Sequence, residues 1–128
     1  MSEASFVIDG RLPGLNEYIR AERAFRLNAA EMKAESEFIV RAAIAQQLRG
    51  VRFERPVRIC YKFFEADRRR DKDNISGYAH KVIQDSLVRS GVLKGDGWNS
   101  IAGYQDDFAV DKKYPRIEVT IRETDSDS

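Results

Sequence analysis

The sequence predicts one α/β domain of the α+β two-layer type, a small mixed sheet that carries two helices. Short runs in which apolar and polar residues alternate are typical of half-buried strands. Longer runs with apolar residues three and four positions apart are typical of amphipathic helices. These runs follow one another in the order β-α-β-α-β-β, and 128 residues is the size of a single domain.

The first half of the chain predicts one strand and one helix. Residues 5–9 alternate as a strand, and a segment rich in Gly and Pro follows them. We expect residues 16–27 to form a polar, basic loop. Asn28 is the expected N-cap of a helix over residues 29–49, with Glu31 completing a capping box. Its apolar stripe is expected to contain the following residues: Phe38, Ile39, Ala42, Ala43 and Ala45.

The second half predicts strand, helix, strand and strand. Residues 57–63 alternate strictly, and residues 66–74 form a charged loop. Residues 74–90 form a helix whose inner stripe is Ile75, Tyr78, Ala79, Val82, Ile83, Ser86 and Leu87. A strand over residues 99–108, a hairpin turn over 111–114 and a strand that begins at Pro115 complete the domain. We expect the domain to span residues 1–122 and residues 123–128 to be an acidic, disordered tail.

Composition excludes several classes of protein. No stretch approaches the roughly 20 apolar residues of a membrane span, and the first residues lack the features of a secretory signal. A single cysteine excludes an internal disulfide and a Cys-rich zinc site, and it suits the cytoplasm. The 22 basic and 21 acidic residues nearly balance. Because three of the acids lie in the tail, the rest of the chain is mildly basic, which permits a nucleic-acid partner.

The densest polar segment, residues 67–74, contains the candidate chemistry. Asp71 and Asp73 are two positions apart, so in an extended segment their carboxylates project to the same side. Two such carboxylates repel each other unless a cation lies between them, and Mg²⁺ or Mn²⁺ is the natural choice. Beside them, the arginines at 68, 69 and 70 would hold phosphates, as a phosphodiester-cleaving enzyme requires. The alternative is a solvated loop whose acids and bases pair locally.

Five other residues could serve either the fold or the function. Asp96, between two glycines, is either a turn residue or a third metal ligand, and the second role requires the next strand to lie beside strand 57–63. Lys81 is either a surface partner of Asp85 or a phosphate ligand. The single histidine, His80, is interpreted as an ordinary, partly exposed helix residue. Trp98 and Tyr104 are assigned to the core or to an interface rather than to base stacking.

Taken together, these segments resemble the RusA-like Holliday junction resolvases of bacteria and their phages. The central match is Arg69 to Asn74, similar to the family's Arg-Arg-Asp-x-Asp-Asn. It continues through residues 81–87, like Lys-x-x-x-Asp-x-Leu, and through residues 91–96, like Gly-x-x-x-Asp-Asp. Residues 12–18 look like the family's Pro-containing Asn-x-x-Tyr loop. The resemblance covers nearly the whole chain.

The resemblance implies a metal-dependent crossover junction endodeoxyribonuclease. Three aspartates would bind Mg²⁺ or Mn²⁺, at Asp71, Asp73 and Asp96, and Lys81 would assist catalysis. The enzyme would work as a homodimer on four-way branched DNA and nick opposite strands, with no small-molecule cofactor. The expected DNA contacts are Arg68, Arg69, Arg70, Lys72, Asn16, Arg20 and Arg23.

The chain departs from the family pattern in one helix. Four additional residues separate Asp73 from Asp85, about one helical turn. Lys81 keeps its face but stands farther from the metal, and Lys72 is the fallback for its role. Two other functions stay open. One is a non-catalytic protein that binds branched DNA, and the other is a nuclease of the same chemistry that acts on flaps, forks or duplex DNA.

Overall fold

The computed structural model describes residues 2–124 and contains a four-stranded mixed sheet with three helices. The strands are β1 (Glu3–Asp9), β2 (Val57–Glu65), β3 (Ile101–Val110) and β4 (Arg116–Glu123). Their order in the sheet is β1-β4-β2-β3; β4 is antiparallel to both of its neighbours, and β3 is parallel to β2. The predicted α+β two-layer class is therefore confirmed.

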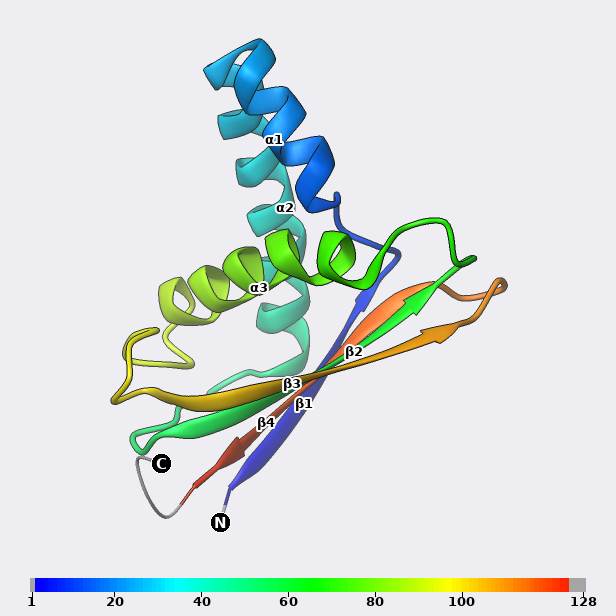
Figure 1. The fold of residues 1–128 in the computed structure, drawn as a ribbon. Helices are drawn as coiled ribbons and strands as arrows, with labels where there is room; N and C mark the ends of the chain where they lie inside the picture. The colour runs from blue at the N-terminus through cyan, green and yellow to red at the C-terminus, as the bar shows by residue number, and fades with distance from the viewer. Residues whose placement is uncertain (1, 125–128) are drawn as a thin grey trace.

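The helices α2 and α3 lie over one face of the sheet, and a helical arm projects from it (Figure 1). α3 (Lys72–Arg89) runs across β2 and β3, and its predicted inner stripe is buried. The lower part of α2 (Arg26–Gln47) packs beside it. The upper part pairs with α1 (Leu15–Ala24), and together they form the arm. The core lies between the sheet and the helices, and its largest fully buried side chains are Tyr61, Phe6, Phe63, Ile8, Ile59, Ile83, Leu87 and Ile121.

The prediction of a loop over residues 16–27 is wrong, because these residues form α1 and the beginning of α2. Leu15 and Tyr18, one turn apart, pack against the core. Glu17 Oε1 accepts a hydrogen bond from Gly14 N at 3.2 Å and so stabilises the first turn. The number of charged side chains in this segment concealed that short apolar stripe.

α2 begins before Asn28, so the predicted N-cap is also wrong. Phe25 occupies the N-cap position in an extended conformation, and its side chain forms no capping bond with the described helix. The predicted apolar stripe has the wrong phase as well: Phe38 is 75% exposed and Ile39 51%, whereas Val40 and Ile44 are buried. Apolar residues lie on several faces of this helix, so their spacing alone does not show which face meets the sheet.

The predicted hairpin at residues 111–114 is not a hairpin, because β2 lies between β3 and β4. The turn crosses the end of β2, and Asp111 N donates a hydrogen bond to the carbonyl of Glu65 at 2.8 Å. The expected tail also begins too early, because Glu123 belongs to β4 and Ser2 N donates to its carboxylate. Residues 125–128 of that tail lie outside the described residues.

Candidate metal and nucleic-acid site

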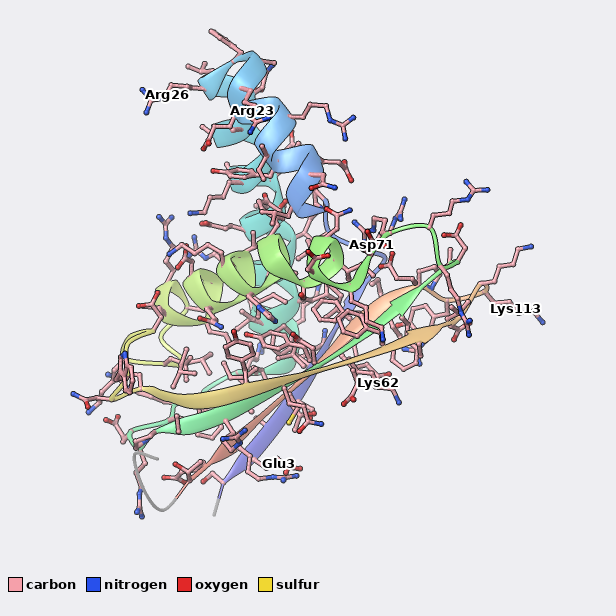
Figure 2. All side chains as sticks on the ribbon, in the orientation of Figure 1. Glu3, Arg23, Arg26, Lys62, Asp71 and Lys113 are labelled. Atoms are coloured by element: carbon pink, nitrogen blue, oxygen red, sulfur yellow. The ribbon has the colours of Figure 1, made fainter. Side chains whose placement is uncertain are left out.

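Asp71 and Asp73 lie at the beginning of α3, just after the loop that connects this helix to β2. β2 ends at Glu65, a short loop follows, and Asp71 is the N-cap of α3. Its carboxylate accepts no capping hydrogen bond from the described helix, so it is not used to start α3. Asp73 Oδ1 accepts a hydrogen bond from Asn74 N at 2.9 Å. Both side chains are exposed, and Figure 2 shows Asp71 at the beginning of α3, near the base of the arm.

A cavity of about 750 Å³ brings the two aspartates together with other charged side chains. Its charged lining residues are Glu65, Asp67, Arg68, Arg70, Asp71, Lys72 and Asp73, and its apolar wall comes from Ile75 and the end of β3. Oxygen-rich sites of this kind suit Mg²⁺ or Mn²⁺. The two carboxylates and the neighbouring cations therefore form the candidate functional site.

Glu65 is a residue of this cavity that sequence reasoning missed. It continues the inward-facing positions 57, 59, 61 and 63 of β2, yet it is charged and only 5% exposed. Arg70 neutralises it through two bonds, Nε to Oε1 at 2.9 Å and Nη2 to Oε2 at 2.8 Å. A charged residue in the inward register of a strand was the signal that could have found it.

Arg70 is held within the fold by three hydrogen bonds. Besides the two bonds to Glu65, its Nη1 donates to the carbonyl of Leu12 at 3.0 Å, and its side chain is 12% exposed. Arg69 differs: its side chain is 90% exposed, and its Nε lies 3.5 Å from Asp67. Arg68 is exposed and lines the cavity. Of the three arginines, 68 and 69 are thus the more accessible to a phosphate.

Asn74 docks the arm onto the candidate site. Its Oδ1 accepts a hydrogen bond from the backbone N of Asn16 at 2.8 Å, at the free N-terminal turn of α1. Gly14 makes this close approach possible, because a Cβ at that position would lie 2.8 Å from Asn74 Oδ1. Arg20 and Arg23 are exposed on α1, and Figure 2 shows Arg23 near the far end of the arm, away from Asp71.

The two candidate lysines occupy different surroundings. Lys72 lines the cavity, and its Nζ lies 5.7 Å from the centre of the Phe108 ring. Lys81 follows Asp73 by eight residues, about 12 Å along the helix. Its Nζ pairs with Asp85 at 3.3 Å, and Asp85 also pairs with Lys33 of α2. The geometry therefore favours Lys72 over Lys81 for a role beside the two aspartates.

The structure does not bring Asp96 to this cavity. β3 does lie beside β2, as a metal-binding role for Asp96 would require, but the two strands are parallel and Val57 pairs with Ile101. Asp96 precedes the start of β3, whereas Asp71 follows the end of β2. The 18 residues of α3 separate the two ends by about 27 Å. Within residues 2–124, no group of three or more His, Cys, Asp or Glu side chains is arranged to hold a metal ion.

Comparison with known proteins does not assign the chain to a family. No protein-family model matches the sequence, and no curated protein matches it. Among residues 2–124, none of the helices combines the length and apolar character needed to cross a bilayer.

Proposed function

We propose that this chain is a metal-dependent endodeoxyribonuclease that resolves four-way DNA junctions by paired nicking of opposite strands. The observation that carries the proposal is the placement of Asp71 and Asp73 in one cavity with Arg68 and Lys72. Carboxylates and cations in one open site match the needs of a phosphodiester and its metal ion. The resemblance of residues 69–96 to the RusA-like resolvases supplies the substrate class.

Two protein carboxylates are enough for a magnesium site when the substrate supplies further ligands to the ion. Mg²⁺ is commonly held by one or two carboxylates, with waters and substrate phosphates completing its shell. Asp71 and Asp73 fit that pattern. The Asp71 carboxylate accepts no capping hydrogen bond from α3, and both side chains line an open cavity. A bound divalent ion would polarise the phosphodiester and lower the pKa of water.

The protein's own residues would position the DNA. Lys72 would hold a phosphate oxygen beside the two aspartates and stabilise the charge that develops there. Arg68 and Arg69 would bind neighbouring phosphates, which orients DNA without reading its sequence. Arg20, Arg23 and Asn16, on the arm that Asn74 docks to α3, would extend this contact away from the cavity. A homodimer would present two such sites to a symmetric junction.

A second candidate function is a protein that binds branched DNA without cleaving it. It is favoured by two observations: Asp96 lies at the far end of the sheet, and Lys81 is engaged by Asp85. This candidate predicts tight junction binding and no product in any divalent metal ion.

The test is cleavage of labelled four-way junction, flap, fork and linear duplex DNA in Mg²⁺, Mn²⁺ and EDTA. We expect symmetric nicks in the junction that disappear in EDTA. Cleavage of flaps, forks or duplex at equal rates would retain the chemistry but replace the substrate. Binding without cleavage in both metals would overturn the enzyme and establish the binding protein.

A further inference from the structure

His80 is a partly exposed helix residue, as expected from the sequence, and it lies in a seam between α3 and β3. Its Nε2 is 2.7 Å from Asp106 Oδ1, and the two side chains are 18% and 20% exposed. A histidine whose ring is oriented by a carboxylate has one nitrogen committed and the other available. The pair therefore fixes which edge of the imidazole can meet a ligand.

Aromatic rings from the two strands beneath α3, β2 and β3, pack against the imidazole. The Tyr61 and Tyr104 rings lie 4.6 and 4.7 Å from it, centroid to centroid. Burial raises the pKa of Tyr61, so its phenol is neutral, and Gln84 donates a hydrogen bond to its oxygen. Tyr104 is 54% exposed, which contradicts a core position for it and leaves this side of the seam open to solvent. Asp106 is then the charged partner that faces His80 across the seam.

The seam continues the surface of the candidate site. Asp73 and His80 are seven residues apart, so they lie about 20° from perfect alignment on α3 and about 10 Å apart along it. Lys81 lies about 80° from Asp73 around the same helix. Phe108, which lines the cavity with Lys72, stacks on Phe63, and Phe63 in turn contacts His80. His80 therefore lies on the same face of α3 as Asp73, about two helical turns further along.

We propose that His80, oriented by Asp106, binds a backbone phosphate of the same DNA strand whose cleavage Asp71 and Asp73 would support. The inference rests on the proposed function. One DNA strand carries a phosphate about every 3.4 Å of helix axis, so a strand that follows α3 passes about three phosphates between Asp73 and His80. With Nε2 bonded to Asp106, Nδ1 is the ring nitrogen left to meet the phosphate, to which an N–H at that position would donate.

The experiment measures the affinity for a labelled four-way junction in EDTA, from low to high salt, for the wild type, His80→Gln and Asp106→Asn at a single pH. Neutralising one phosphate changes the slope of log K against log salt by about 0.9. We expect the slope of His80→Gln to be shallower than the wild-type slope by up to about that amount. Asp106→Asn, which removes the carboxylate that orients the ring, should lie between the two.

Lys94→Gln is the matched control, because Lys94 pairs with Glu54 rather than with a group of the seam. It should keep the wild-type slope. Thermal melting of each variant separates a binding effect from loss of fold. A folded His80→Gln protein with the wild-type slope and affinity would overturn the inference.

Failure of this inference is distinguishable from failure of the proposed function. A protein that cleaves junctions but whose salt slope is unchanged by His80→Gln keeps its nuclease assignment and loses the role of His80. A protein that neither binds nor cleaves the junction loses both.

Discussion

Arg70 illustrates how one residue of a charged run can serve the fold while its neighbours face solvent. It ties three segments together: the end of β2 through Glu65, the loop before α3 through its own backbone, and the chain before α1 through Leu12. Without Arg70, the buried Glu65 carboxylate would keep only the exposed Arg11, whose Nη1 lies 3.6 Å from Glu65 Oε1, so most of its charge would be uncompensated in a poorly solvated place. Arg70 therefore anchors the loop that carries Asp71.

We predict that Arg70→Ala lowers the free energy of unfolding by about 3–5 kcal/mol, the scale for breaking a buried pair. Arg69→Ala is the control, and its effect should stay within about 0.5 kcal/mol, as for most exposed substitutions. Urea denaturation monitored by circular dichroism measures both. Equal stabilities of the two variants would contradict the structural role of Arg70.

Lys72 and Lys81 offer a second test at the scale of single residues. Lys72 lines the cavity with the aspartates, whereas Lys81 forms an i,i+4 pair with Asp85 on the flank toward α2. Lys72→Gln should slow single-turnover junction cleavage by about a hundredfold or more, the scale for losing one charge-stabilising group. Lys81→Gln should have the smaller effect. The reverse order would place Lys81 in the site.

At the scale of elements, the docking of α1 onto α3 positions the basic arm. Asn74 caps α1, and Gly77 of α3 lets Leu15 approach, because a Cβ at Gly77 would lie 3.1 Å from Leu15 Cδ2. Tyr18 and Tyr78 add a ring contact at 5.0 Å. Asn74, which follows the two aspartates in the motif, thus holds α1 against α3.

We predict that Asn74→Ala costs about 1 kcal/mol, the typical value of a lost helix cap. The loss should be local to α1. Amide hydrogen exchange should become faster in α1, while the amides of β2 and β4 keep their protection. Uniformly faster exchange across the sheet would instead show that Asn74 supports the whole fold.

How far the sequence predicts each element follows from how many faces of it are apolar. β2 and α3 each have one unambiguous apolar face, so their strand and helix patterns are confirmed. α2 carries exposed Phe38 and Ile39 beside buried Val40, so its spacing did not identify the inner face. The alternating pattern of a strand does not predict its direction. The parallel pairing of β2 with β3, which the structure reveals, is what places Asp96 far from Asp71.

At the scale of the whole molecule, the position of Asp96 constrains any role it has at the metal. Because about 27 Å of α3 separates the two ends within one chain, Asp96 could reach the aspartates only from a second copy. The homodimer of the proposed function makes that arrangement possible.

Mixing inactive variants tests this constraint. If Asp96→Asn alone is inactive, mixing it with Asp73→Asn should restore cleavage, because the mixed dimer contains one site with both aspartates. Full activity of Asp96→Asn would remove Asp96 from the metal site. An inactive Asp96→Asn protein that is not rescued by mixing would contradict the placement of the two residues.

The proposed function rests on the claim that the cavity containing Asp71 and Asp73 is the catalytic centre. The most direct measurement is the single-turnover rate of junction cleavage in Mg²⁺ for Asp73→Asn against Asp67→Asn, a control in the same cavity whose native carboxylate contacts Arg69. We predict that Asp73→Asn loses about a hundredfold or more in rate and still binds the junction, while Asp67→Asn stays near wild type. Wild-type cleavage by Asp73→Asn would contradict the claim.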